Sequence, residues 1–529
     1  MNVPLTPIRF LYRAMDLFAR KVGIVCGTRT FTYGEFGQRA LRLAGALRKN
    51  GIEPGDRVAF LSFNNHQLLE GYYGAPLMRA IVMPLNVRLS LPELIAILNH
   101  SGARFLLYEN DFLPQVEQLK ASCACIERFV ALDENSAGAD LTYENLLTQG
   151  TPDPIDFMDF DENEVAELFY TSGSTGTPKG VMLTHRTLYL HAMSVATLAG
   201  DPKDLVDLHT IPLFHANGWG RPQSSTMLGS KQVMVRRFEP SSVFRLIEEH
   251  RATEMSLVPT MANALLNAPD REQYDLSSMR RVMLGGAAAS PALVARVEAA
   301  FHCEVISGYG MTETAPVLTT ARNKGTVDES NAEERHRRHA MAGWAVPGME
   351  IRVVDVNMHP VPRDAQTIGE VIARGDHLMA GYFKDPDATA MTIENGWIHT
   401  GDMGTWDEEG YIQIVDRKKE IIISGGENIS SIEVEKAISS HPAVDECAVV
   451  PAPDERWGEV PAAIVVLKPG SVLSSEELME FLTGLLGRFK LPRIIEFRED
   501  PLPKTGTGKI RKLILKEKFW TGKEKRVQG

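Results

Sequence analysis

Long apolar runs and excess positive charge are both missing from this sequence of 529 residues. No window approaches the roughly 20 apolar residues that a membrane-spanning helix needs, so we expect no integral membrane association. The formal net charge is −12 at pH 7, which argues against non-specific binding to nucleic acid. Both absences favour a cytoplasmic protein that is at most peripheral to a membrane.

Cysteine is also scarce, with five residues scattered along the chain. Cys123 and Cys125 stand too close together for the usual zinc-binding pair, and no second pair or histidine run in the sequence completes such a site. We interpret the cysteines as reduced thiols of an intracellular protein.

Residues 1–23 carry apolar side chains at helical spacing, among them Phe10 and Leu17. Charged residues such as Arg13 and Asp16 interrupt them, so the segment lacks the uninterrupted apolar core of a signal peptide. We predict a surface helix here.

The chain is too long for one hydrophobic core, so we expect two or more domains. Its first part alternates short strand-like runs with amphipathic helical runs, which is typical of βαβ units and largely parallel sheets. Predicted strands cover 57–63, 103–109, 165–171, 280–286 and 303–310, and predicted helices cover 240–252 and 290–302. The fold class is therefore α/β, with ligands expected at the carboxyl ends of strands.

The pattern changes after about residue 340, where short half-buried strands joined by turns indicate a β-rich subdomain. A polar break at 416–420 precedes a new series of strand and helix patterns. We predict a large N-terminal domain of layered sheets over 1–416, a hinge over 417–420, and a small mobile C-terminal α/β domain over 421–529.

Two charged stretches favour solvated structure. In residues 333–339, EERHRRH, helical spacing pairs Glu333 with Arg337 and Glu334 with Arg338, which predicts an exposed helix face. The tail 501–529 has nine Lys/Arg against two Glu. We interpret it as a solvated chain end, with a phosphate-rich ligand or an anionic surface as the alternative.

Glycines and hydroxyl residues surround a single lysine, Lys179, in YTSGSTGTPKGV at 170–181. Glycine lets the backbone approach a ligand closely, and exposed N–H groups with hydroxyls form a nest for an anion. The order Pro178-Lys179-Gly180 differs from the Gly-Lys-Ser/Thr end of a P-loop. The stretch predicts a phosphate-binding loop of another kind, and a flexible linker is the alternative.

A second stretch, Tyr309-Gly310-Met311-Thr312-Glu313, follows a predicted strand. An aromatic ring such as that of Tyr309 stacks well on a flat base, and Thr312 can donate to a phosphate. The carboxylate of Glu313 is a hard oxygen ligand of the kind that Mg²⁺ prefers.

Two further stretches are weaker signals when each is taken alone. In Thr400-Gly401-Asp402, an aspartate on a tight turn can accept both ribose hydroxyls, and Arg417 can brace the same sugar; a plain turn is the alternative. Lys509 closes the glycine-rich stretch PKTGTGK at 503–509, where a mobile basic loop without catalytic role is the alternative.

Together and in this order, these stretches resemble one family, the adenylate-forming acyl-CoA synthetases, whose relatives include luciferases and carrier-protein adenylation domains. The resemblance covers nearly the whole chain. It is carried by Phe31-Thr32-Tyr33, the 170–181 loop, Pro212-Leu213-Phe214-His215, YGMTE at 309–313, Gly381-Tyr382-Phe383, TGD at 400–402, DRKKE at 416–420, Ser424-Gly425-Gly426-Glu427-Asn428 and PKTGTGK at 503–509. It implies a large N-terminal domain of layered sheets and a small C-terminal domain that swings about a hinge.

The resemblance implies that ATP activates a carboxylic acid as an acyl-adenylate with release of pyrophosphate, and that coenzyme A then takes the acyl group with release of AMP. Negative charge gathers on the α-phosphate and on the leaving pyrophosphate, where cations and N–H donors stabilise it. By resemblance, Lys179 is one such cation, Glu313 holds Mg²⁺ together with Thr175, and Thr312 contacts the α-phosphate. Lys509 bridges the carboxylate and the α-phosphate in the first half-reaction.

The implied ATP and AMP site consists of glycine, hydroxyl and charged residues. Its members are Thr171, Ser172, Gly173, Ser174, Thr175, Gly176, Thr177, Lys179, Gly286, Gly308, Tyr309, Gly310, Met311, Thr312, Asp402, Arg417 and Lys509. In the second half-reaction the small domain rotates about a hinge at Lys419 and presents a pantetheine channel. The resemblance lines this channel with Ser424, Gly425 and Gly426; Trp457 is a candidate lid, although we favour a core position for it.

The implied acyl pocket contains His215, Trp219, Gly285, Ala287, Gly308 and Pro316. Relatives that activate amino acids commonly place an aspartate after the aromatic residue of the PLFH region, whereas Ala216 follows His215 here, so an amino acid substrate is not expected. Trp219 resembles a tryptophan near the acyl tunnel of fatty acyl-CoA synthetases, with core packing as the alternative. Arg221 departs from the small or apolar residue expected there, and we predict that it is structural or points to solvent; the alternative is that it faces the pocket and pairs with a second polar group of the substrate.

Small side chains over 285–289 leave room for an alkyl or aryl tail. The 321–343 segment resembles the fatty acyl branch that includes methylthiopropionate ligases, which implies a medium- to long-chain acid. A homodimer is compatible with the resemblance.

Two other functions stay open at this point. One is an adenylating enzyme that delivers its acyl group to a carrier protein. The other is a catalytically inactive protein of the same fold that binds a nucleotide or acyl-CoA, although the presence of Lys179, Glu313, Asp402 and Lys509 argues against it.

Overall fold

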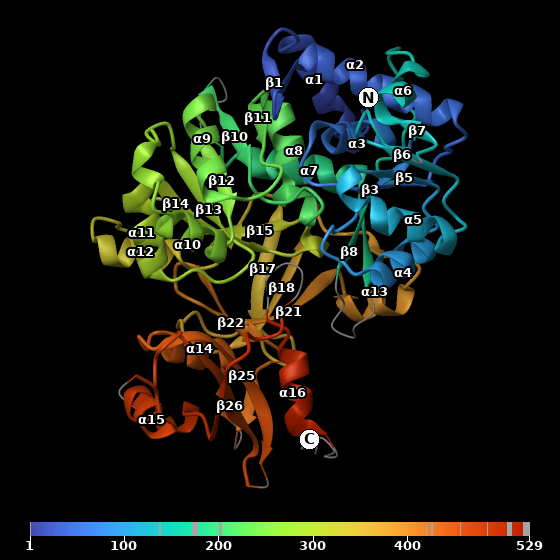
Figure 1. Ribbon diagram of the computed structural model, residues 1–529. Helices are drawn as coiled ribbons and strands as arrows, with labels where there is room; N and C mark the ends of the chain where they lie inside the picture. The colour runs from blue at the N-terminus through green and yellow to red at the C-terminus, as the bar shows by residue number, and fades with distance from the viewer. Residues whose placement is uncertain are drawn as a thin grey trace. The chain divides into compact units, whose positions relative to one another are not determined.

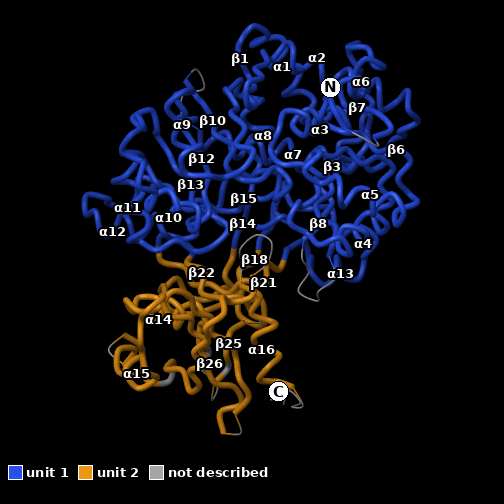
Figure 2. Tube along the Cα trace, viewed as in Figure 1, with its two compact units in different colours: residues 1–351, 373–398, 409–412 blue, residues 352–372, 399–408, 413–529 orange. Residues whose placement is uncertain are grey.

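The computed structural model describes residues 2–136, 139–171, 178–199, 204–418, 420–424, 427–454, 456–483, 485–504 and 510–521. The chain forms two compact units, which Figure 2 colours separately. Unit 1 comprises residues 1–351, 373–398 and 409–412, and unit 2 comprises 352–372, 399–408 and 413–529. The expected α/β class, with a large N-terminal part and a smaller C-terminal part, is confirmed. The boundaries at 416 and 421 stay predictions.

Among the described residues of unit 1, nine strands form one sheet, here called sheet 1 (Figure 1). The strands from β14 to β1 run parallel, and β16, β15 and β2 pair antiparallel at the two edges. In spatial order they are β16 (Trp344–Ala345), β15 (Val317–Thr320), β14 (Glu304–Gly310), β13 (Arg281–Leu284), β12 (Glu254–Leu257), β10 (Val206–His209), β11 (Lys231–Met234), β1 (Val22–Cys26) and β2 (Arg29–Thr32).

Eight strands of the described chain form sheet 2, which is also mostly parallel. Its order is β19 (Gly381–Tyr382), β9 (Lys179–Thr184), β8 (Val165–Thr171), β4 (Ile81–Pro84), β3 (Arg57–Leu61), β5 (Phe105–Tyr108), β6 (Arg128–Ala131) and β7 (Leu141–Thr142). Its central strands are buried almost throughout, as their continuous apolar runs predict for strands covered on both faces.

The helices of unit 1 begin where the sequence supplies capping residues. Thr32 and Glu35 form a reciprocal capping box, and Ser290 caps a helix that has Pro291 at its first position. The helices are α1 (Ile8–Leu17), α2 (Tyr33–Lys49), α3 (His66–Leu77), α4 (Leu91–Ser101), α5 (Leu113–Ser122), α6 (Tyr143–Thr148), α7 (His185–Ala196), α8 (Ala216–Leu228), α9 (Pro240–His250), α10 (Pro259–Asn267), α11 (Pro291–Phe301), α12 (Ala332–His339) and α13 (Pro386–Thr392).

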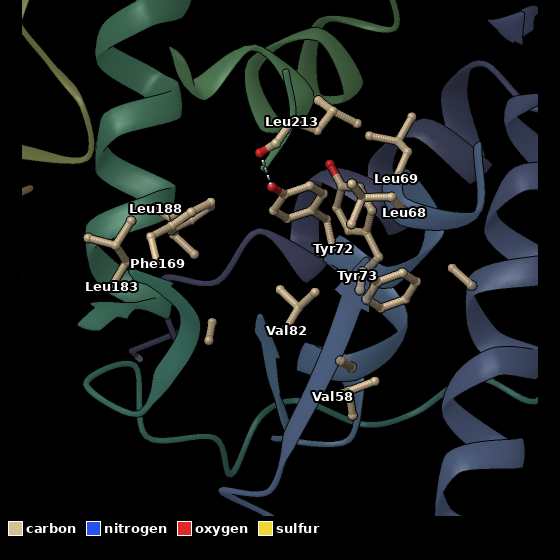
Figure 3. Packing of buried hydrophobic residues seen from close by; sticks show 14 of the residues in the cluster. Val58, Leu68, Leu69, Tyr72, Tyr73, Val82, Phe169, Leu183, Leu188 and Leu213 are labelled. Carbon is tan, nitrogen blue, oxygen red and sulfur yellow. Dashed lines mark hydrogen bonds between the residues drawn. The ribbon is translucent and has the colours of Figure 1, made fainter. Parts of the chain in front are cut away.

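The two sheets of unit 1 share a hydrophobic core. One buried cluster contains Ile24 and Leu318 from sheet 1 and Val82 and Phe169 from sheet 2. Figure 3 shows part of this core around Tyr72 of α3, whose hydroxyl donates a hydrogen bond to the carbonyl of Leu213 at 2.7 Å. The core therefore fixes the chain that leads into α8.

The elements predicted from sequence are confirmed with small changes at their ends. All five predicted strands are present, as β3, β5, β8, β13 and β14, and the two predicted helices are α9 and α11. The N-terminal helix α1 buries Phe10 and Leu11 but leaves Leu17 58% exposed, as expected for a surface helix. The five cysteines all lie within the described residues and are free thiols. None of the helices that the structure describes has the length and apolar character that crossing a membrane requires.

The β-rich subdomain is sheet 3, in which β18 and β21 contribute residues to both units. It contains β17 (Met349–Val354), β18 (Gly369–Gly375), β20 (Ile393–Glu394), β21 (Trp397–Trp406) and β22 (Ile412–Arg417). Sheet 4 lies within unit 2 and has its own buried clusters. It contains β23 (Ile422–Ser424), β24 (Glu427–Ile429), β25 (Val444–Asp454), β26 (Gly458–Leu467) and β27 (Ile494–Arg498), beside α14 (Ser431–Ser439), α15 (Ser475–Thr483) and α16 (Lys512–Trp520).

Candidate active site

The predicted phosphate loop connects two paired strands of sheet 2. β8 and β9 run antiparallel, and Thr171, the last residue of β8, stands opposite Lys179, the first residue of β9. The structure thus brings the two ends of the loop together. The predicted loop residues Ser172, Gly173, Ser174, Thr175, Gly176 and Thr177 lie outside the described residues.

Tyr382, a residue that sequence reasoning did not select, contacts both Lys179 and Glu313. The Tyr382 hydroxyl donates a hydrogen bond to Glu313 Oε1 at 2.8 Å, and Lys179 Nζ lies 4.9 Å from the centroid of the Tyr382 ring. Burial and the Glu313 carboxylate raise the pKa of Tyr382, so its phenol stays protonated and keeps donating. The Gly381-Tyr382-Phe383 string carried the family resemblance, and this was the one signal that pointed to Tyr382.

The backbone also fixes Glu313 in place. The residue lies on a short 3-10 helix, Thr312–Thr314, directly after β14, and its carbonyl accepts a hydrogen bond from Met379 N at 2.9 Å. Both Thr312 and Glu313 are buried, with 8% and 7% exposure. A buried carboxylate that accepts a hydrogen bond from a phenol is suited to bind a cation that accompanies phosphate.

Glycines at the ends of β13 and β14 leave room that Trp219 occupies. A side chain at Gly285 would place its Cβ 2.9 Å from Trp219 Cη2 and 3.2 Å from the carbonyl oxygen of Gly308. A Cβ at Gly286 would lie 3.4 Å from Trp219 Cζ2. The indole therefore lies over both glycines, and the structure brings together Trp219, Gly285, Gly286 and Gly308.

Close backbone approach also explains Gly310. A Cβ there would lie 1.8 Å from the carbonyl oxygen of Pro316, so no other residue fits without a shift of the chain. Pro316 is buried and Ala287 is exposed. Tyr309 and Met311 flank Gly310 and are both partly buried.

His215 is the N-cap of α8 and is partly buried. The carbonyl of His215 accepts a hydrogen bond from Gly218 N at 3.1 Å. Leu213, two residues before it, is held by Asn64 as well as by Tyr72. The PLFH segment is thus tied to the core before the chain reaches the acyl-pocket residues.

Arg221 has a structural role, as expected. Its guanidinium contacts Asp207 Oδ2 at 2.9 Å and Glu254 Oε2 at 2.7 Å; both carboxylates are buried, and the Arg221 side chain is 11% exposed. Burial opposes the charge of Asp207, but the neighbouring Arg221 cation outweighs it and lowers the pKa of that carboxyl. The Arg221 guanidinium is therefore paired with one carboxylate on β10 and one on β12.

In unit 2 the two predicted ribose residues form an ion pair. Arg417 Nε lies 2.6 Å from Asp402 Oδ1, which connects β22 to β21. The predicted tight turn at Asp402 is wrong, because Thr400, Gly401 and Asp402 lie inside the long strand β21. Gly401 has φ +69°, and this local left-handed conformation accounts for the turn-like sequence.

The channel and hinge residues are only partly described. Ser424 ends β23, whereas Gly425, Gly426 and Lys419 lie outside the described residues. The core position favoured for Trp457 is wrong: the residue is 37% exposed between β25 and β26, and the Arg456 guanidinium lies 4.9 Å from its ring centroid. A channel role for Trp457 stays a prediction.

Lys509 also lies outside the described residues, but the base of its loop is described. Lys504 and Ile510 form an antiparallel bridge, and Arg511 N donates to the carbonyl of Pro503 at 2.7 Å. The chain therefore leaves and re-enters the fold at neighbouring points on either side of residues 505–509.

In the part of the chain that the structure describes, His, Cys, Asp and Glu side chains form no group of three that could hold a metal ion. Glu313 is a single carboxylate, and a carboxylate is the donor that Mg²⁺ takes when substrate phosphates supply further oxygens. The donor chemistry of Glu313 therefore fits this ion.

Comparison with known proteins gives the same class of protein. The family model described as AMP-binding enzyme matches residues 11–383, and the model of the AMP-binding enzyme C-terminal domain matches residues 433–509. The chain belongs to this family of adenylate-forming enzymes, in its acid–CoA ligase branch. It is thus an AMP-forming ligase that uses ATP and coenzyme A.

Similar proteins extend over nearly the whole chain. A long-chain-fatty-acid–CoA ligase of Thermus thermophilus is 38% identical, over 96% of this chain and 95% of the relative. The 4-hydroxybutyrate–CoA ligase 2 of Metallosphaera sedula is 35% identical, over 97% and 94%. Among solved structures, the anthranilate CoA ligase AuaEII in complex with anthranoyl-AMP has a TM-score of 0.86 and 26% identity, and the match covers 98% of each chain.

Proposed function

We propose that this ligase activates a medium- to long-chain alkanoic acid, and that the residues assigned above carry the two half-reactions. The observation that supports the assignment is the contact of Lys179, Tyr382 and Glu313 beside the mouth of the 172–177 loop. A cation and a carboxylate near the two ends of this loop support a binding site for the phosphates of ATP there.

In the first half-reaction a carboxylate oxygen of the acid attacks the α-phosphorus, and the bond from that phosphorus to the bridging oxygen breaks as pyrophosphate leaves. Lys179 stabilises the negative charge of the departing phosphates. Glu313, oriented by the Tyr382 hydroxyl, would hold Mg²⁺, which would neutralise phosphate charge. Lys509 contacts the carboxylate and the α-phosphate.

In the second half-reaction the CoA thiol loses its proton and attacks the acyl carbonyl carbon, and AMP leaves. Asp402 and Arg417 hold the ribose of the nucleotide. Rotation of the small domain about Lys419 withdraws Lys509 and brings Ser424, with its two following glycines, to the pantetheine. One lysine thus serves only the first half of the reaction.

Trp219 and Gly285 support the assignment of the acyl pocket. The glycine pair at 285–286 lets the Trp219 indole lie directly over the carboxyl end of β13, so the indole would form one wall of the acyl pocket. Two relatives differ in the acids that their names record, one a long-chain fatty acid and the other 4-hydroxybutyrate. Chain length is therefore the part of the proposal that most needs measurement.

Acid-dependent pyrophosphate release tests the function directly. Purified protein is assayed with ATP, Mg²⁺ and straight-chain acids from two to sixteen carbons together with aryl acids, with and without CoA. We expect pyrophosphate release with octanoate to dodecanoate and AMP release that CoA stimulates. Release without CoA stimulation would favour delivery to a carrier protein, and no release with any acid would favour an inactive binding protein.

The variant Lys509→Ala separates the half-reactions. We expect adenylate formation to fall by about 100-fold or more, since one stabilising donor is lost, while thioester formation from supplied acyl-adenylate is retained. Lys518→Ala is the matched control, because Lys518 is a lysine of the same unit that is 63% exposed and pairs with Glu496. Equal loss in both half-reactions would contradict the assigned role of Lys509.

A further inference from the structure

Helix α8 begins with a turn of the opposite hand. Ala216, Asn217, Gly218, Trp219 and Gly220 all have positive φ, between 45° and 75°. Left-handed backbone costs L-residues about 1–2 kcal/mol each, and glycine and asparagine tolerate it best. Such a run persists only where surrounding structure enforces it. We call these residues the 216–220 turn.

A chain of two buried hydrogen bonds ties the 216–220 turn to sheet 2. Asn217 Nδ2 donates to Gln223 Oε1 at 2.9 Å, and Gln223 Nε2 donates to Glu167 Oε1 at 2.7 Å. The three residues are 1%, 2% and 0% exposed. Glu167 belongs to β8, the strand that leads into the phosphate loop. We call this chain of side chains the neutral tether.

Burial favours the uncharged form of the carboxyl in the neutral tether, because it raises the pKa of Glu167 well above its ordinary value. Among the described residues, Glu167 takes part in no ion pair. Gln223 is the residue that links the other two members, because its amide both accepts and donates.

The 216–220 turn determines where the Trp219 indole lies. The ring covers Gly285 and Gly286, as described above. Gly220 follows Trp219, and a Cβ at Gly220 would lie 2.1 Å from Cε1 of His191. Because His191 belongs to α7, the turn is also packed directly against that helix. A change in the turn therefore moves the wall of the acyl pocket.

We propose that Gln223, held by Glu167, is a positioning residue that fixes the 216–220 turn and thereby sets the length of acyl chain the ligase accepts. This rests on the proposed function, in which Trp219 and Gly285 line the acyl pocket. Gln223 does not touch the substrate. It acts through Asn217, because loss of the Gln223 amide leaves the Asn217 amide buried without that acceptor.

The variant Gln223→Leu tests the proposal, because it keeps side-chain size and removes both hydrogen bonds. We measure kcat and KM for acids from butyrate to dodecanoate in the wild type and the variant. We expect the ratio of kcat/KM for dodecanoate to kcat/KM for butyrate to rise by about tenfold, as the wall of the pocket loosens. The change should appear mainly in KM, since the reacting groups are untouched.

Glu167→Gln is the matched conservative variant. An amide oxygen can accept from Gln223 Nε2 as the protonated carboxyl does, so we expect the wild-type ratio within about twofold. Thermal unfolding of each variant separates a change of selectivity from loss of the fold. If Gln223→Leu does not fold, Gln223→Met is measured in its place.

The outcomes decide between the two proposals. A folded, active Gln223→Leu protein with the wild-type chain-length ratio would overturn the role of Gln223 and leave the proposed function intact. A wild-type protein that activates no acid in the series would overturn the proposed function itself. An altered ratio in Glu167→Gln as large as that in Gln223→Leu would also contradict the neutral tether.

Discussion

Helix α8 is tied to both large sheets of unit 1, and the two connections differ in kind. The neutral tether joins Asn217 and Gln223 to Glu167 on sheet 2 through amide and carboxyl groups. On the other side, Arg221 joins Asp207 and Glu254 on sheet 1 through buried charges. Arg221 lies between Asn217 and Gln223 in the sequence, so residues that contact sheet 1 and sheet 2 alternate along α8.

The difference follows from the surroundings of each carboxyl group. Glu167 takes part in no ion pair among the described residues, and burial raises the pKa of its carboxyl, which favours the protonated form. Asp207 lies beside Arg221, receives a hydrogen bond from Ser225 Oγ at 2.7 Å, and stays ionised. A buried acid thus serves as a neutral or a charged partner according to whether a cation accompanies it.

Removal of the cation should have the largest effect on stability. In Arg221→Met, Asp207 becomes a buried carboxylate without its guanidinium partner, whereas Glu254 keeps Arg281 at 3.3 Å. We expect a loss of about 3–5 kcal/mol in the free energy of unfolding, measured by chemical denaturation. The double variant Arg221→Met/Asp207→Asn should recover part of this loss, and no recovery would contradict the unpaired charge as its cause.

Replacement of Glu167 should have a smaller effect on the free energy of unfolding, and this effect should depend on pH. The folded pKa of Glu167 lies above its ordinary value of 4.5, so ionisation favours the unfolded chain and stability falls as pH rises above that value. Glutamine does not titrate. The stability of Glu167→Gln relative to wild type should therefore increase with pH between 5 and 8, by at most about 1.4 kcal/mol per pH unit.

Unfolding midpoints of both proteins at several pH values in this range check the prediction. The difference between Glu167→Gln and wild type is the measured quantity, because other groups titrate equally in both. A difference that stays constant across the range would show that Glu167 is already ionised in the folded protein.

The smallest effect is expected for a charge on the surface. On α12, Arg337 contacts Glu334 at 2.7 Å and its side chain is 48% exposed. Arg338 contacts the same carboxylate at 2.8 Å, so Glu334 keeps a partner after Arg337→Ala. We expect a change below about 0.5 kcal/mol in the free energy of unfolding. A loss comparable to that of Arg221→Met would show that burial does not set the stabilising effect of these charges.

Sequence periodicity predicted the framework of unit 1 well. Strands such as β3 and β14 and the helix α11 have continuous apolar runs or clear amphipathic spacing, and such local patterns reflect burial on one or both faces. The pairing of Glu334 with Arg338 on α12 was also predicted from spacing, because residues four apart on a helix are neighbours. Arg337 was expected to pair with Glu333, but it contacts Glu334, three residues before it.

Contacts between distant parts of the chain were not predictable in this way. Tyr382 reaches Glu313 across 69 residues, and Arg221 reaches Glu254 across 33. The sequence singled out Arg221 as unusual, but only the parallel neighbours β10 and β12 reveal why two carboxylates meet it. Pairing of this kind is a property of the sheet order and not of the local sequence.

Prediction from the sequence was also less successful where the backbone adopts a left-handed conformation. Asp402 was placed on a turn because it follows a glycine, yet that glycine is a left-handed residue within β21. The 216–220 turn was not predicted: Asn217, Gly218 and Gly220 are compatible with positive φ, but Ala216 and Trp219 are not residues that favour it. Trp457 was placed in the core by its apolar character alone, although its position at a strand end exposes it.

Two short segments have their ends paired in the folded protein, which affects the entropic cost of ordering them. The paired residues are Thr171 with Lys179 and Lys504 with Ile510. In both cases the folded protein has already joined the two ends of a short segment before any nucleotide arrives. The entropic cost of loop closure therefore falls on folding and not on binding. If the two loops bind phosphates as proposed, more of that interaction energy remains for affinity and for the transition state.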